Sequence, residues 1–226
     1  MLRSLCVSCG CFADRDDGIC RHCTEELPRL DPACQACALP LPAGAPFCGR
    51  CARGRLPVMR SHCLFEYRAP IDQLITRFKF RADLTVGQYL GRWLAKELRI
   101  ADMPDAIVPV PLHRRRLRQR GFNQALELIK PLATARGVPI RLDLVERRID
   151  TPDQIGLSAL QRRRNMRQAF ACTGQALPRH VALFDDVVTT GATVLTLARC
   201  LRAAGVERVD VWALARATGS ITRQRR

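Results

Sequence analysis

Apolar positions along this chain fall into two patterns, and the two patterns alternate over most of its length. Short continuous apolar runs predict buried strands, and apolar residues that recur every three or four positions predict helices packed on a core. The runs are Ala106–Val110, Leu142–Arg147, Val181–Phe184 and Arg208–Ala215. Helical spacing covers Phe122–Arg136, closed by Gly137, and the residues from Val194 to Leu201, ended by Gly205. Strands that alternate with helices predict a parallel α/β sheet, with right-handed connections and a site at the carboxyl ends of its strands.

A separate segment precedes this core. Residues 63–67 predict a short strand, and two helically spaced segments follow it ahead of the main sheet. The spaced residues are Ile71, Leu74, Ile75 and Phe78 in one segment and Val86, Leu90, Trp93 and Leu94 in the other. Residues 53–61 are basic and contain Gly54 and Pro57, which predicts a linker. We therefore expect a small domain over residues 1–60 and an α/β domain over residues 61–226.

Cysteines are concentrated near the amino terminus. The chain has 12 of them, and ten lie within the first 63 residues. Eight form two copies of the pattern C-x2-C-x10-C-x2-C, displaced by 28 residues: Cys6, Cys9, Cys20 and Cys23, then Cys34, Cys37, Cys48 and Cys51. Four thiolates from two tight knuckles suit tetrahedral Zn²⁺. The pattern therefore resembles a tandem double zinc ribbon that holds one or two structural zinc ions.

The sequence leaves the ligand pairing open. Thiolates could pair across the two repeats as well as within each, whereas a thioredoxin-like redox pair does not account for four knuckles in two matched sets. Cys11 and Cys63 remain as spare candidate ligands, and His22 is expected to be a bystander. Cys172 and Cys200 are expected to be buried apolar residues.

The carboxyl end of one predicted strand carries the densest set of candidate ligand groups. Residues 181–193 read VALFDDVVTTGAT, in which two carboxylates precede a small-residue turn that contains threonines. The free N–H groups of such a turn, and the dipole of the helix that begins there, favour a bound phosphate. The carboxylates can accept hydrogen bonds from the two vicinal hydroxyls of a ribose. The competing interpretation is an ordinary strand–turn–helix of some other α/β fold.

The same stretch resembles the phosphoribosyl-pyrophosphate (PRPP) signature of type I phosphoribosyltransferases. That signature is an apolar strand, two acidic residues, two apolar residues and then T-T-G-x-T. The resemblance implies a type I phosphoribosyltransferase fold, in which Asp185 and Asp186 bind the ribose and serve as catalytic residues. It implies that Mg²⁺-bound PRPP is held by Asp185, Asp186, Val187, Val188, Thr189, Thr190, Gly191, Ala192 and Thr193.

Positive charge is high and clustered. The formal net charge is +16, which favours a polyanionic partner, either nucleic acid or a phosphorylated small molecule. The clusters are residues 113–120, Arg162–Arg164 and Arg223–Arg226. For the first cluster, the resemblance implies a pyrophosphate loop made of Val110, Pro111, Leu112, His113, Arg114, Arg118 and Arg120. A solvated basic face is the alternative interpretation of these arginines.

Two longer segments resemble the ComF family of competence-associated, phosphoribosyltransferase-like proteins. They are PVPLHRRRLRQRGFNQA at residues 109–125 and QIGLSALQRRRNMRQAF at residues 154–170. Together with the cysteine repeat and the PRPP signature, they extend the likeness over nearly the whole chain. The resemblance implies a role in DNA uptake during natural transformation, with single-stranded DNA and competence-machinery proteins as partners.

Two functions stay open at this point. One is a PRPP-binding, nucleic-acid-binding factor with little or no turnover. The other is an active phosphoribosyltransferase of nucleotide metabolism, which joins PRPP to a nitrogenous acceptor and releases pyrophosphate. No apolar run approaches the roughly 18–20 residues that span a bilayer, and the amino-terminal segment does not have the pattern of a signal peptide. We therefore expect a cytoplasmic protein without membrane insertion.

Overall fold

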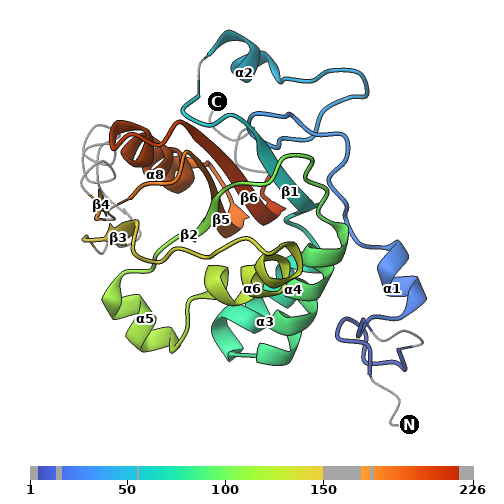
Figure 1. Cartoon of the computed structure of the whole chain (residues 1–226). Coiled ribbons are helices and arrows are strands. Elements are labelled where there is room, and N and C mark those ends of the chain that lie inside the picture. Colours follow the sequence, from blue (N-terminus) through green and yellow to red (C-terminus); the bar gives the residue numbers. More distant parts are fainter. Residues whose placement is uncertain (1–4, 14–16, 55, 150–168, 174–175, 219–226) are drawn as a thin grey trace, which may run out of the picture.

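The fold is built around a four-stranded parallel sheet with the strand order β1-β6-β5-β2 (Figure 1). This computed structural model describes residues 5–13, 17–54, 56–149, 169–173 and 176–218. The strands of the sheet are β1 (Ser61–Glu66), β2 (Ala106–Pro109), β5 (His180–Val188) and β6 (Arg208–Arg216). All three strand pairs are parallel, so the parallel α/β architecture expected from the alternating pattern is confirmed.

Helices cover both faces of the sheet because successive side chains of a buried strand point to opposite sides. In β5, Ala182 and Phe184 belong to a core shared with one group of helices, whereas Val181 and Leu183 belong to a core on the other face. The first group is α3 (Ile71–Arg81), α4 (Leu84–Glu97) and α6 (Gln124–Arg136), and the other face is covered by α8 (Ala192–Ala203).

Local sequence signals set several helix ends. The Asp83 side chain accepts a hydrogen bond from the Val86 N–H and so caps α4, and Asn123 caps α6 through the N–H groups of Ala125 and Leu126. Gly137 ends α6 in the left-handed conformation, with φ of 65°. These helices and their ends agree with the predicted spacing to within a few residues.

The short strand predicted at residues 63–67 is confirmed as β1, which pairs with β6 as the edge of the main sheet. Two other sequence-based expectations need correction. Within the predicted run Leu142–Arg147, only β3 (Val145–Arg147) is a strand, and it pairs antiparallel with β4 (Phe170–Cys172) outside the main sheet. The basic segment after β2 is not only a loop, because α5 spans Arg114–Arg120.

The predicted linker is packed against the α/β core. Val58 is buried among the residues under α8, and the Met59 N–H donates to the Val209 carbonyl at 2.8 Å. The Arg60 carbonyl in turn accepts a hydrogen bond from the Val211 N–H. The cysteine-rich segment therefore lies against the sheet domain over this stretch instead of hanging from a free connection.

The cysteine-rich segment contains two short helices, α1 (Arg21–Glu25) and α2 (Gly49–Arg53), which lie at well-separated places around β1 (Figure 1). Apolar residues of its first half, including Ile19 and Leu27, join the core of α3 and α4. Within the described ranges, no helix combines the length and the apolar character needed to cross a bilayer.

Candidate ligand site and cysteine clusters

The turn between β5 and α8 forms a small open cradle. Thr189, Thr190 and Ala192 are exposed there, and Gly191 adopts a φ of 79°, a left-handed conformation that a side chain disfavours. A cavity of about 40 Å³ lies over the turn and is lined by Asp185 and residues 187–194. The first-turn N–H groups of α8 and the threonine hydroxyls at this end can therefore meet an anion from solvent.

The two carboxylates of the acidic doublet have different surroundings. Asp185 lines the cavity over the turn, and its Oδ1 accepts a hydrogen bond from the Asp186 N–H at 2.9 Å. Asp186 is only 2% exposed, is not among the lining residues, and forms an ion pair with the Lys79 ammonium of α3. Burial, and then the adjacent Asp186 charge, raise the pKa of Asp185 well above its usual value.

Lys79 is a site residue that the sequence reasoning did not identify. It lies on α3 between Phe78, which is buried, and Phe80, which is exposed. The chain has only three lysines, and this one interrupts an apolar helical stretch. That combination was the signal available in the sequence, because a lysine close to a buried helix face needs a carboxylate partner.

Among the predicted pyrophosphate-loop residues, Arg120 is the one that lies near the acidic doublet. Burial lowers the pKa of its guanidinium, while the charge of Asp186 opposes that shift. Its Nη1 donates to Gln124 Oε1 at 2.6 Å, and its guanidinium lies 5.5 Å from the centre of the Phe80 ring. These contacts hold the Arg120 guanidinium, on which the charge of Asp186 acts.

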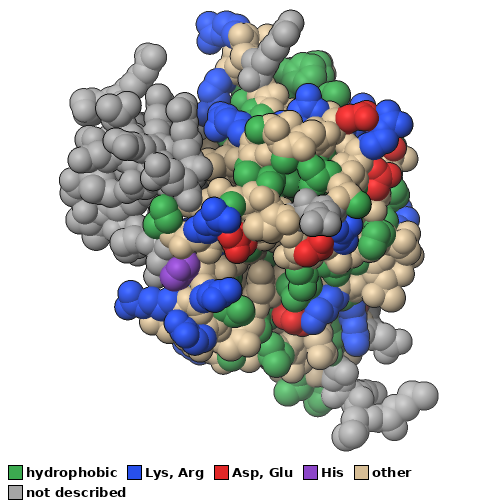
Figure 2. Space-filling view, turned by 60° about the vertical axis from the view of Figure 1, so that its left-hand side comes forward, with side chains coloured by type: hydrophobic (Ala, Val, Ile, Leu, Met, Phe, Trp, Pro, Cys, Tyr) green, Lys and Arg blue, Asp and Glu red, His purple; other side chains and the backbone are tan. Residues whose placement is uncertain are grey.

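The remaining residues of the predicted pyrophosphate loop differ in their surroundings. Val110 is buried in the sheet core, and His113 caps α5 by accepting a hydrogen bond from the Arg115 N–H. Pro111 and Leu112 are partly buried, whereas Arg114 and Arg118 are exposed. Figure 2 shows Lys and Arg side chains in separate groups on this face, with acidic side chains between several of them. The Arg162–Arg164 and Arg223–Arg226 clusters, and residues 154–168 of the second family-like segment, lie outside the described residues.

The eight repeated cysteines come together as two separate four-thiol clusters. Within each cluster the Sγ atoms lie within 4.8 Å of one another, and the grouping follows the repeats: Cys6, Cys9, Cys20 and Cys23 form the first cluster, and Cys34, Cys37, Cys48 and Cys51 form the second. The structure thus favours pairing within each repeat over pairing across them. The spare candidates Cys11 and Cys63, and the bystander His22, belong to neither cluster.

The spacing of the thiols suits tetrahedral zinc. The Cys9–Cys20 and Cys37–Cys48 Sγ pairs are each 3.8 Å apart. Four ligands about 2.3 Å from a central Zn²⁺ leave tetrahedral edges of about 3.8 Å. Burial opposes ionisation of Cys6, yet N–H donors from Cys20, Cys9 and Ser8 lower its pKa to about 6, while burial raises the pKa of Cys23 to about 12. A divalent cation would let all four thiols of such a cluster ionise together.

Cys172 and Cys200 differ from the expectation of fully buried apolar residues. Both are half-buried, and their Sγ atoms lie 3.1 Å apart. Burial raises the pKa of Cys172 to about 12, so the thiol is held protonated.

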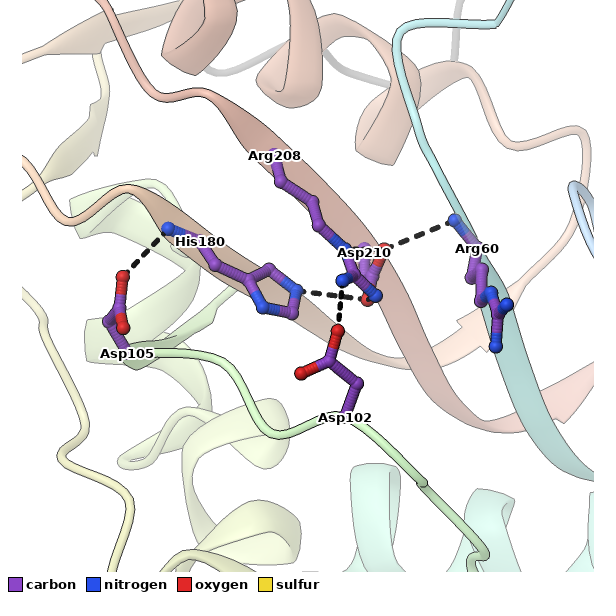
Figure 3. A network of polar contacts seen from close by, with 6 residues as sticks. All are labelled: Arg60, Asp102, Asp105, His180, Arg208 and Asp210. Carbon is purple, nitrogen blue, oxygen red and sulfur yellow. Dashed lines mark hydrogen bonds and ion pairs between the residues drawn. The ribbon is translucent and has the colours of Figure 1, made fainter.

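A buried polar network closes the opposite, amino-terminal end of β5 and β6 (Figure 3). Asp210 is 1% exposed and accepts hydrogen bonds from Arg208 Nη2 at 2.9 Å and from the Arg60 N–H at 3.1 Å. Its Oδ2 also lies 2.9 Å from His180 Nε2. Since the carboxylate is satisfied by these partners and lies away from the cradle, the network fixes the amino-terminal ends of β5 and β6.

The comparisons with known proteins agree with this architecture. A family model described as a double zinc ribbon domain matches residues 2–52. "Competence protein F" of Haemophilus influenzae is 41% identical over 160 residues, covering 67% of this chain and 70% of that protein. "DNA utilization protein YhgH" of Escherichia coli K12 is 37% identical over 166 residues, which cover 71% of this chain and 73% of that protein.

Among solved structures, adenine phosphoribosyltransferase of Leishmania tarentolae aligns with 70% of this chain and 91% of its own, at 13% identity and a TM-score of 0.42. The parallel sheet and the two cysteine clusters define an α/β protein with an amino-terminal double zinc ribbon. Given its identity with the curated relatives, the chain belongs to the ComF family.

Proposed function

We propose that this protein binds Mg²⁺–PRPP at the β5–α8 turn and uses it in the handling of incoming single-stranded DNA during DNA uptake. One observation carries the proposal: an open, threonine-lined helix start directly follows a carboxylate pair whose other side holds two cations, Lys79 and Arg120. The names of the relatives, a competence protein and a DNA utilization protein, support the DNA-uptake role.

Each part of PRPP has a complementary group in this arrangement. The 5′-phosphate would accept hydrogen bonds from the turn and from the Thr189, Thr190 and Thr193 hydroxyls. The ribose hydroxyls would donate to Asp185 and Asp186, and Lys79 forms an ion pair with Asp186. Bound Mg²⁺ would neutralise part of the pyrophosphate charge.

The pyrophosphate would lie toward Lys79 and Arg120, where positive charge is already concentrated. Arg120 is held by Gln124 and by the Phe80 ring, so little side-chain freedom is lost when it meets an anion. Arg114 and Arg118 are exposed and are not held in this way. We therefore assign the leaving-group side of the ligand to Lys79 and Arg120.

DNA binding would be mainly electrostatic. The formal charge of +16 falls by two for each zinc bound to four thiolates, and it stays strongly positive with two ions bound. Aromatic residues make up only 5% of the chain, so stacking on bases supplies little affinity. Exposed arginines of α5, beside the candidate ligand site, are suited to contact a phosphate backbone.

Catalytic phosphoribosyl transfer is the second candidate function. The observation in its favour is that the acidic doublet lies with two cations, because Asp186 pairs with Lys79 and its charge acts on Arg120. In that reaction a nitrogen nucleophile bonds to C1 of the ribose while the C1–O bond to pyrophosphate breaks, and pyrophosphate leaves with the bonding pair. Asp185 or Asp186 would stabilise the cationic ribose, and Lys79 and Arg120 the leaving group. Pyrophosphate release in the presence of a panel of nucleobases and amines tests this candidate.

Calorimetric titration of Mg²⁺–PRPP tests ligand binding. We expect the wild type to bind and the double variant Asp185→Asn, Asp186→Asn to bind at least about tenfold more weakly, because each carboxylate loses its charge. The matched control is Asp143→Asn, an exposed carboxylate paired with Arg141 away from the site. Equal affinity in the double variant and the wild type would contradict the assignment.

Salt titration of single-stranded DNA binding tests the proposed contact between DNA and the arginines of α5. Affinity should fall steeply with salt, and the variant Arg114→Gln, Arg118→Gln should reduce the slope of log K against log salt by about 1.4, roughly 0.7 for each lost phosphate contact. The control variant Arg136→Gln, Arg179→Gln removes two exposed arginines of other surfaces. A slope unchanged in the first variant, or reduced as much in the control, would count against α5 as the contact.

A further inference from the structure

The second cysteine cluster is joined to the β5–α8 turn by one buried arginine. We propose that Arg216 is a positioning residue that couples metal binding at this cluster to PRPP binding at the turn, so that each favours the other. The proposal rests on the proposed function, because it requires PRPP to bind at this turn. Nothing in the sequence motifs pointed to Arg216, which lies one residue beyond the predicted strand Arg208–Ala215.

Arg216 is the last residue of β6, and it is only 2% exposed. Its Nε donates to the Cys37 carbonyl at 3.0 Å, within the second cluster. Its Nη1 donates to the Val188 carbonyl at 2.9 Å, to the Ala217 carbonyl at 2.7 Å, and to the Thr189 carbonyl. One guanidinium therefore holds a metal-site knuckle and the start of the candidate phosphate turn at the same time.

The knuckle is fixed to the sheet through three consecutive carbonyls. The Gln35 carbonyl accepts a hydrogen bond from the Ser61 N–H at 2.7 Å, and the Ala36 carbonyl accepts one from the Ser61 hydroxyl at 2.8 Å. The Cys37 carbonyl is the third, and Arg216 is its donor. The order that a bound metal imposes on the Cys34–Cys37 knuckle would thus be passed to Arg216 directly.

The hydrogen bonds to the turn orient the groups that would meet a phosphate. In a planar trans peptide the C=O and the following N–H point in opposite directions. Because the Val188 and Thr189 carbonyls face Arg216, the N–H groups of Thr189 and Thr190 point away from it. Holding these two peptide planes in place prepares their donors before a ligand arrives, which lowers the entropic cost of binding.

The first cysteine cluster provides an internal control. Its segment is anchored to helices, with the Val7 carbonyl accepting from Arg77 Nη1 at 2.6 Å and the Asp17 carbonyl from Trp93 Nε1 at 3.0 Å. These anchors lie on α3 and α4, not on the β5–α8 turn. Coupling through Arg216 therefore predicts that PRPP affects the second cluster and leaves the first unchanged.

Linkage makes the coupling reciprocal, so metal release can report it. The zinc-loaded full-length protein is treated with a chelator and pulsed with a thiol alkylating reagent, and mass spectrometry follows the labelling of Cys9 and Cys20 separately from that of Cys37 and Cys48. We expect Mg²⁺–PRPP to slow labelling of the second cluster at least about fivefold and to leave the first unchanged. Parallel calorimetry establishes whether the same sample binds PRPP.

The variant Arg216→Lys keeps the charge and removes the planar fork that reaches both carbonyl groups. We expect it to label faster at the second cluster even without PRPP, to lose the protection by PRPP, and to bind PRPP about tenfold more weakly. Arg208→Lys, at the other end of the same strand, is the matched control and should keep the protection.

Any other outcome contradicts the coupling, the role of Arg216 or the proposed function, as follows. If PRPP binds the wild type but protects neither cluster, or both equally, the coupling is wrong while the proposed function stands. Protection that persists in Arg216→Lys removes the role of Arg216. If the wild type does not bind PRPP at all, the proposed function fails and the coupling fails with it. Should Arg216→Lys not fold, the wild-type comparison of the two clusters still decides the coupling.

Discussion

The two cysteine clusters have the same spacing and the same donor atoms, yet they are attached to different parts of the molecule. The first is part of the core under α3 and α4, where Cys6 and Cys23 pack with Ile19 and Leu27. The second lies against the sheet, where Ser61 at the start of β1 and Arg216 at the end of β6 bind its knuckle. Equal chemistry thus serves two purposes, because the neighbours of each cluster differ.

Because of this contrast, we expect the loss of metal to have a different effect at each cluster. Loss of metal from the first cluster removes support from a helical core, and so it should mainly affect stability. Loss of metal from the second loosens the residues that hold the Val188 and Thr189 carbonyls, and so it should mainly affect the ligand turn. Cys20 and Cys48 occupy equivalent positions in the two repeats, and both are half-buried, so they are matched sites for testing the difference.

The largest expected effect is on stability. Cys20→Ser should lower the free energy of unfolding by about 3 kcal/mol, because it removes a metal ligand next to the α3–α4 core. Cys48→Ser should cost about half as much. Thermal unfolding of both variants measures this, at roughly 2–4 °C for each kcal/mol in a chain of this size. Equal losses would break the contrast between the clusters.

The next effect is on ligand affinity, and here Cys48→Ser should have the larger effect and Cys20→Ser the smaller. Cys48→Ser should weaken binding of Mg²⁺–PRPP about tenfold, or about 1.4 kcal/mol, because the knuckle that supports Arg216 loses its metal. Cys20→Ser should change the affinity by less than about twofold. Calorimetry well below the unfolding temperature of both variants makes the measurement, and an equal loss in the two would contradict a specific link to the second cluster.

A change of similar size tests the anchor of the first cluster, the hydrogen bond from Trp93 to the Asp17 carbonyl. Trp93→Phe removes the donor to the Asp17 carbonyl and should lower the free energy of unfolding by about 1.5 kcal/mol, because a part-buried hydrogen bond is lost. The affinity for PRPP should stay unchanged, since this contact is far from the ligand turn. Urea denaturation measures the change in stability, and calorimetry measures the affinity for PRPP. Weaker PRPP binding would show that the hydrogen bond between Trp93 and Asp17 also affects the ligand site.

The smallest effect concerns pH. The pKa of Asp185 is raised in the folded state, so the folded protein holds this proton more tightly than the unfolded chain does. Its contribution to stability is present below the unfolded pKa, near 4, and is lost as pH rises through the folded pKa. Asp185→Asn should therefore be about 1 kcal/mol more stable than the wild type at pH 8, with the difference vanishing toward pH 4. If Asp185→Asn is instead less stable than the wild type at pH 8, burial does not disfavour the ionised Asp185 carboxylate in the folded state.

Periodicity predicted most of the fold, because strands and helices buried on one face leave a local record in the chain. The runs that became β2, β5 and β6 and the helices α3, α4, α6 and α8 were all visible in this way. The role of residues 61–66 as a sheet edge was not, since strand pairing depends on residues about 150 positions away. Nor did periodicity show that Val145–Arg147 leaves the main sheet.

The candidate site was predicted where its residues are contiguous and missed where they are not. The acidic doublet, the turn and the cysteine repeat form motifs in which spacing alone carries the chemistry. Lys79 and Arg216 belong to no such motif, and each is defined by a partner distant in sequence, Asp186 for one and the Cys37 carbonyl for the other. Arg120 was predicted only as one of several arginines, and packing against Phe80 and Gln124 set it apart.

By itself, the sequence determined the parallel α/β core, the strand–turn–helix that carries the acidic doublet and the threonines, and the two sets of four thiols. These features rest on local spacing, which a chain carries whether or not it is folded. Tertiary structure decided which carboxylate faces the cavity, which cations stand beside the doublet, and which cysteine cluster supports the turn. Those choices depend on contacts between residues far apart in the chain, and only the packing of helices against the sheet brings such residues together.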